Sequence, residues 1–138
     1  MHIVGILGKV IVDGYERLLE VKQGSPDSSV WLLVLEPQWL QLGDQSSNFK
    51  AGQAVNLEVL LRYVTAALPI TSGESIGLQQ PIAESSHTVL IGRVSRIIDA
   101  ESFECTLGSE TIHVELERAQ SLSVNQLVKV GGELASAG

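Results

Sequence analysis

The clearest alternation of apolar and polar residues lies between positions 90 and 134, in short runs separated by turn residues. In the run 112–117, three aliphatic side chains alternate with His113, Glu115 and Glu117. A period of two is typical of a half-buried β-strand, because successive side chains point to opposite faces of a sheet. The pattern predicts four short strands in this part of the chain and little else.

A more divergent version of the same pattern runs from residue 3 to residue 61. Strands are predicted on either side of Asp13-Gly14, a dipeptide that favours hairpin turns. Another is predicted over Val30–Glu36, where Pro37 ends the run because proline cannot donate to a sheet. Segment 54–67 has apolar residues at spacings that suit both a strand and a helix, so its periodicity leaves the choice open.

The two regions align as copies of one unit once gaps are allowed in two loops. The superposed pairs are Gly8 with Gly92, Gly24 with Gly108, Leu33–Glu36 with Val114–Glu117, and Val55–Leu61 with Val128–Leu134. The last segment contains Gly131-Gly132, and adjacent glycines cost a helix interior about 2 kcal/mol. The alignment therefore predicts a strand over 55–61. The alternative is a chance similarity between two β segments rich in Val, Leu and Gly.

Short strands separated by frequent turn residues predict an all-β fold. We expect a small β-barrel of seven or eight strands, OB-like or related, which two four-stranded repeats would make pseudo-symmetric. The OB-like resemblance rests on spacing over residues 90 to 134 and assigns no family role to any residue. We expect one domain over residues 1–138, with repeat-like halves 3–61 and 88–134 and a connector 62–87.

Composition narrows the possible classes of partner. The chain has 138 residues, of which 44% are hydrophobic and 18% charged, so it has enough apolar surface to fold. Its net charge is −7, and each half carries seven acidic and four basic residues. Nucleic-acid binding draws its affinity from Lys and Arg, so a nucleic-acid partner is disfavoured.

Three features of the sequence bear on the compartment. No apolar run approaches the roughly 18 to 20 residues that cross a bilayer, and the N-terminal residues do not resemble a signal peptide. The single cysteine, Cys105, cannot form an internal disulfide. We therefore expect a cytoplasmic protein without a membrane partner.

The candidate chemistry is sparse. Cys105 lies in an alternating run that buries it, and an apolar setting keeps a thiol protonated. His113, Glu115 and Glu117 share one strand face, but neighbours on that face are about 7 Å apart, too far to close a metal site without ligands from other strands. No phosphate-binding glycine loop and no recognisable triad are present. We assign no catalytic residue, metal or cofactor, and expect a protein that is not an enzyme.

The alignment points to a candidate interface in the first copy. It places Leu32, Val34 and Glu36 where the second copy has His113, Glu115 and Glu117, so a polar face becomes largely apolar. Such a face needs cover, either from within the chain or from another molecule. We predict that Val34→Glu would dissociate an oligomer without unfolding the monomer. The candidate interface residues are Trp31, Leu32, Val34, Trp39 and Phe49.

These observations favour a non-catalytic binding protein that acts through protein contacts or self-association. Its acidic character would suit a basic partner, as in an inhibitor or immunity-type protein. Two alternatives remain open: an OB-like module that binds nucleic acid or oligosaccharide, and an enzyme whose site is assembled from loops.

Overall fold

The computed structural model describes residues 1–24, 28–37, 47–71 and 74–137. The predicted all-β class is confirmed: the described residues form ten strands and no helix. The predicted number of seven or eight strands was too low, because the connector contributes two short strands, β5 and β6. In chain order the strands are β1 (His2–Asp13), β2 (Glu16–Lys22), β3 (Ser29–Leu35), β4 (Ala54–Val64), β5 (Ala67–Pro69), β6 (Gly77–Gln79), β7 (His87–Asp99), β8 (Ser102–Leu107), β9 (Glu110–Leu116) and β10 (Leu127–Ser136).

Residues 54–64, which suited both a strand and a helix, form strand β4. Glycine at the tight turns explains how the short strands connect. Gly14 follows β1 with φ +59°, and Gly108 joins β8 to β9 with φ +64°. A side chain is disfavoured at such angles, so glycine lets the chain reverse within two residues.

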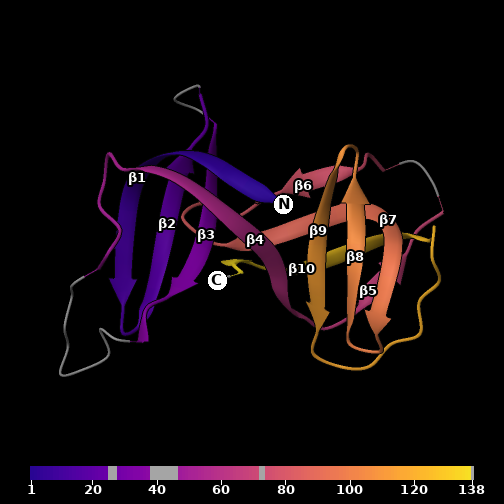
Figure 1. Cartoon of the computed structure of the whole chain (residues 1–138). Coiled ribbons are helices and arrows are strands. Elements are labelled where there is room, and N and C mark those ends of the chain that lie inside the picture. The colour runs from indigo at the N-terminus through magenta and orange to yellow at the C-terminus, as the bar shows by residue number, and fades with distance from the viewer. Residues whose placement is uncertain (25–27, 38–46, 72–73, 138) are drawn as a thin grey trace.

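The sheet contains two three-stranded antiparallel meanders, β1–β2–β3 and β7–β8–β9. Figure 1 shows them on opposite sides of the molecule, with β4 and β10 crossing between them. Hydrogen bonds connect β4 to β1, β9 and β10, and connect β10 to β3, β4 and β7. Each meander is thereby part of a closed ring of five hydrogen-bonded strands, and both rings include β4 and β10.

The pairing of β4 with β10 places Leu61 directly opposite Leu134. Each of these two strands also makes a parallel pair with the opposite meander: Leu61 with Val114 of β9, and Ala135 with Leu33 of β3. Neither meander closes a ring with the strands of its own half of the chain alone. The two halves therefore depend on each other for their hydrogen bonding.

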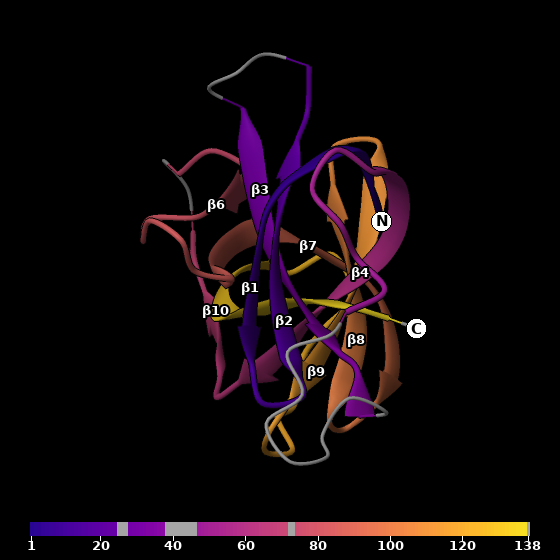
Figure 2. The same cartoon turned by 90° about the vertical axis from the view of Figure 1, so that its left-hand side faces the viewer.

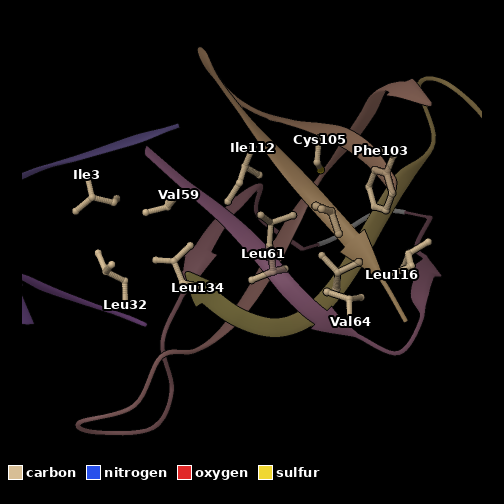
Figure 3. Packing of buried hydrophobic residues seen from close by; sticks show 14 of the residues in the cluster. Ile3, Leu32, Val59, Leu61, Val64, Phe103, Cys105, Ile112, Leu116 and Leu134 are labelled. Carbon is tan, nitrogen blue, oxygen red and sulfur yellow. The ribbon is translucent and has the colours of Figure 1, made fainter. Parts of the chain in front are cut away.

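The buried side chains form one continuous cluster across both rings. In Figure 3, Ile3, Leu32 and Val59 lie toward one end, Phe103, Cys105 and Leu116 lie toward the other, and Leu61 lies between them. Leu61, Cys105 and Leu32 are fully buried. A shared core of this kind makes the two rings one packing unit.

The assignment of faces in β3 was wrong by one residue. Leu32 and Val34 point into the core, with 0% and 6% of their surface exposed, so they are not an outer face. In β9 the buried residues are Ile112, Val114 and Leu116, as their alternation predicted. Because side chains alternate, a slip of one residue exchanges the two faces. Val34→Glu would therefore bury a carboxylate and unfold the chain, rather than dissociate an oligomer.

Candidate functional site

The face of β1–β2–β3 that points away from the core carries three rows of side chains across the strands. We call it the β1–β3 outer face; Figure 2 views the molecule from this side. The strand registers place Ile11 opposite Leu18 and Leu18 opposite Leu33, which forms an apolar middle row. On one side of it lie Lys9, Glu20 and Trp31, and on the other lie Asp13, Glu16 and Leu35.

The middle row is apolar although it faces outward. Ile11 is 39% exposed, and Leu18 and Leu33 are partly buried. A lone exposed aliphatic residue is ordinary on a protein surface, but a row across three strands is a common feature of binding surfaces.

The other meander is polar at the positions that match the β2 and β3 residues of this face. The match is set by Gly24 and Gly108, which follow the central strands β2 and β8 and both have a positive φ. Leu18 lies six residues before Gly24, and Ser102 lies six residues before Gly108. Ser102 pairs with Glu115 as Leu18 pairs with Leu33. In the same register His113 replaces Trp31, and Glu117 replaces Leu35. The contrast between an apolar and a polar outer face therefore holds, but the apolar residues are Trp31, Leu33 and Leu35.

The connector crosses part of this face. The side-chain amide of Gln80 accepts a hydrogen bond from the Trp31 N–H at 2.8 Å and donates one to the Trp31 carbonyl at 2.6 Å. It thus occupies the backbone groups of β3 that another strand would use. Farther along, Glu84 accepts a hydrogen bond from the Lys9 ammonium at 2.6 Å, and this contact raises the pKa of Lys9. The chain therefore covers part of its own apolar face.

A hollow of about 240 Å³ remains between the connector and the strands. Ile11, Leu18 and Leu33 form its apolar part. Polar groups complete the lining: Asp13 and Glu16 from the strands, and Glu84, Ser85 and Ser86 from the connector. Three carboxylates therefore surround a small apolar surface.

A buried ion pair lies on the inner side of the same strand ends. Arg17 Nε is 3.1 Å from Glu36 Oε1, and both side chains are almost fully buried. Arg17 also donates to the Gly14 carbonyl at 2.8 Å, while Glu36 accepts from the Ser47 hydroxyl at 2.5 Å and the Asn48 N–H at 3.1 Å. These bonds connect the β1–β2 turn and the end of β3 to residues Ser47 and Asn48.

The structure separates the five candidate interface residues. Trp31 is on the outer face, while Leu32 and Val34 are in the core. Phe49 packs against the core and lines a different hollow, of about 610 Å³, beside β1. Trp39 lies outside the described residues. Leu33 and Leu35, which the sequence analysis missed, lie on the outer face because they alternate with the buried Leu32 and Val34.

On the outer face of the other meander, the charged side chains form pairs across the strands. Arg96 donates to Glu104 at 2.6 Å, and this bond holds the pKa of the Glu104 carboxyl below its usual range. His113 lies opposite Glu104 and borders a hollow of about 510 Å³. Within the described ranges, no three His, Cys, Asp or Glu side chains are arranged to hold a metal ion.

Cys105 is fully buried, as its alternating run predicted, and burial raises the pKa of its thiol to about 12. A thiol with that pKa stays protonated at neutral pH, so it is a poor nucleophile and a poor metal ligand. In the part of the chain that the structure describes, no helix is long and apolar enough to span a membrane.

No protein-family model matches the chain, and no curated protein or solved structure matches it either.

Proposed function

We propose that this protein acts without catalysis, by binding another protein through the β1–β3 outer face. The observation that carries the proposal is the apolar row of Ile11, Leu18 and Leu33, which faces outward where the other meander has Ser102 and Glu115. An apolar face flanked by charged groups is a usual form of a protein-binding surface. Conversely, Cys105 is buried and protonated, which leaves it unsuited to nucleophilic catalysis.

We further propose that the chain is a duplicated unit of two OB-like barrels that share strands β4 and β10. An OB fold is a five-stranded Greek-key barrel, and each ring here has a meander closed by two further strands. The first support comes from matching loops. Leu7 N–H donates to the Gln53 carbonyl at 2.9 Å, as Val94 N–H does to the Gln126 carbonyl at 2.9 Å. This match of Leu7 with Val94 shifts the alignment of β1 on β7 by three residues from the superposition of Gly8 on Gly92. The residue before each glutamine has a positive φ, +88° and +74°.

The side chains of these two glutamines also act alike. The Oε1 atom of Gln53 accepts from the Lys50 N–H at 3.1 Å, and that of Gln126 accepts from the Ser123 N–H at 3.2 Å. The second support is that corresponding residues pair across the strands in both halves. Superposing Gly24 on Gly108 matches Leu18 with Ser102, and their cross-strand partners are Leu33 and Glu115. Superposing Gln53 on Gln126 matches Arg62 with Ala135. The Leu33–Ala135 pair therefore corresponds to Glu115 and Arg62, and this pair continues the observed Leu61–Val114 register.

If the two halves are copies, their shared scaffold has kept the same pairing while their outer faces have diverged. The second half has Arg96, Glu104 and His113 in its outer row, which is compatible with a solvated surface. The first half has Trp31, Leu33 and Leu35. Binding is therefore assigned to the first half, and scaffolding to the second.

The proposed partner is a basic protein. Net charge is −7, and Asp13, Glu16 and Glu84 lie beside the apolar row, so a positively charged surface would be attracted and oriented by it. An inhibitor or immunity-type protein that binds a basic partner would use an acidic face of this kind. Because the one cysteine is unpaired and buried, we propose the reducing cytoplasm as the compartment.

A second candidate function is an OB-like module that binds an oligosaccharide or oligonucleotide. The position of Trp31 on β3 favours it, because ligands of OB folds lie on the second and third strands and an aromatic ring can stack on a sugar or base. The carboxylates beside the face oppose an oligonucleotide. A tryptophan fluorescence titration with single-stranded oligonucleotide tests this function, and a response that weakens with added salt would support it.

The test of the main proposal compares three tagged chains purified from the native host: wild type, Leu33→Gln and the control Leu68→Gln. Leu68 is 59% exposed and lies in β5, away from the outer face. We expect one protein to co-purify stoichiometrically with wild type and Leu68→Gln. Its recovery should fall by at least about five-fold with Leu33→Gln, which corresponds to a loss of about 1 kcal/mol of binding free energy. Equal recovery with all three chains would contradict the proposal.

A further inference from the structure

The hollow on the β1–β3 outer face has the shape and chemistry of a pocket for one side chain. Its volume of about 240 Å³ lies below the roughly 300–1,000 Å³ of small-molecule sites. We propose that it receives an arginine side chain of the partner protein. This inference rests on the proposed protein-binding function and specifies the group that the face recognises.

The apolar part of the hollow would hold the stem of such a side chain. Ile11, Leu18 and Leu33 are neighbours across three strands, so together they present a continuous aliphatic surface. Long basic side chains bury their methylene groups on such surfaces while the charged head stays at the edge. A purely apolar side chain would leave the surrounding carboxylates without a partner, so the lining selects for a group with both properties.

The carboxylates are placed to receive the head. Asp13 and Glu16 are direct cross-strand partners at one wall of the hollow, and Glu84 belongs to the connector that forms another wall. Lys9 already pairs with Glu84, whereas neither Asp13 nor Glu16 makes an ion pair within the described part of the chain. With Lys9 included, the lining has a net charge of −2, which one guanidinium would reduce.

Arginine suits this lining better than lysine. Its guanidinium has five donors in a plane and is weakly hydrated, so it can lie on an apolar surface and still bond carboxylates on more than one side. Lysine presents a compact, strongly hydrated ammonium, which loses more hydration free energy on entering an apolar hollow. Arginine is also among the residues that most often anchor protein interfaces.

The other half of the chain shows what the hollow requires. At the matching positions Ser102 and Glu115 replace Leu18 and Leu33, so the second meander lacks two of the three aliphatic residues that would hold the stem. The same strands can thus be built without the pocket. Leu18→Ser therefore removes the central residue of the apolar surface and introduces the residue that β8 has at the matching position.

The experiment titrates the full ¹⁵N-labelled chain with N-acetyl-arginine amide, followed by amide chemical shifts. The matched probe is N-acetyl-citrulline amide, which has nearly the same shape and no charge, and N-acetyl-lysine amide tests the preference between cations. We expect millimolar binding of the arginine probe, with shifts at Ile11, Leu18 and Leu33. We expect weaker binding of the lysine probe and little binding of the citrulline probe.

The variants Glu16→Gln and Glu84→Gln should each lower the affinity for the arginine probe by about two- to five-fold, the range for exposed ion pairs. Leu18→Ser should weaken it at least as much, and the control Glu110→Gln, in the other meander, should not change it. Equal binding of arginine and citrulline, or shifts that spread over the surface without including the hollow, would overturn the inference.

The same variants separate this inference from the proposed function. If a protein partner is lost with Leu33→Gln but is retained by Glu16→Gln and Glu84→Gln, the protein-binding function stands and the arginine pocket is refuted. If the arginine probe binds at the hollow but no protein depends on Leu33, the partner assignment is refuted. Loss of the partner with all of these variants, and its retention by Glu110→Gln, is the result that the inference predicts.

Discussion

Two adjacent residues of β3, Leu33 and Val34, should respond very differently to the same substitution. Val34 is 6% exposed and packs in the core, whereas Leu33 lies on the outer face beside the hollow. Glutamine at position 34 would lose about 1.5–3 kcal/mol of apolar burial. It would also bury an amide without a partner, which costs about 1–3 kcal/mol more. We therefore expect Val34→Gln to lower the free energy of unfolding by about 3–6 kcal/mol.

Leu33→Gln places the amide where water can reach it, and the lost burial is partial. We expect a loss of less than about 1.5 kcal/mol. Urea denaturation followed by circular dichroism and tryptophan fluorescence measures both values, with similar m-values as the check that unfolding stays two-state. A domain of this size has only about 5–15 kcal/mol of stability in total, so Val34→Gln should lose a large fraction of it. Equal losses at the two positions, or a larger loss at Leu33, would refute the assignment of faces.

Three further substitutions or reactions test other parts of the structure. Gly92→Ala should destabilise the chain by about 1–3 kcal/mol, because its new Cβ would lie 2.6 Å from the Thr106 carbonyl oxygen. Gly131→Ala should be close to neutral, because the nearest neighbour of its new Cβ is 3.8 Å away. Thermal unfolding compares the two variants. Glu36→Ala should lower the free energy of unfolding by about 3–5 kcal/mol, because it leaves the buried Arg17 without its carboxylate. Glu117→Ala, at an exposed position, should lower it by less than about 0.5 kcal/mol. Chemical denaturation measures both values, and similar losses would contradict the buried pair. With a thiol pKa of about 12, Cys105 should stay protonated and unlabelled by a disulfide reagent at pH 8 in the folded chain and react at once in denaturant; rapid labelling of the folded chain would contradict its burial.

Local patterns were sufficient to predict the all-β class and most strand positions. The alternation in β9 identified its buried face correctly, and the run around Cys105 predicted a buried thiol. Both segments have polar residues on one face only, so the period of two is visible in the sequence. The same rule could not be applied to β3, because Val30–Leu35 is apolar on both faces.

That ambiguity explains the misplaced interface. With no polar residue to mark the outer face, the gapped alignment chose a register one residue away, and Leu32 and Val34 were assigned to the surface in place of Leu33 and Leu35. The pairing of β4 with β10 is a different kind of omission. Leu61 and Leu134 are far apart in the sequence, and no local pattern specifies which distant strand a given strand will pair with. The place of Glu84 beside Lys9 depends on the path of the connector and was not foreseeable for the same reason.

The most direct test of the β1–β3 outer face as a binding surface is site-specific photo-crosslinking in the native host. A photoreactive phenylalanine analogue replaces Leu33 in one full-length chain and Glu115, which holds the matching pair position in the other meander, in a second chain. The proposal predicts one discrete protein adduct at position 33, none at position 115, and loss of the adduct when Glu16→Gln and Glu84→Gln are added. Equal adducts at both positions, or none at position 33 from cells that label efficiently elsewhere, would contradict it.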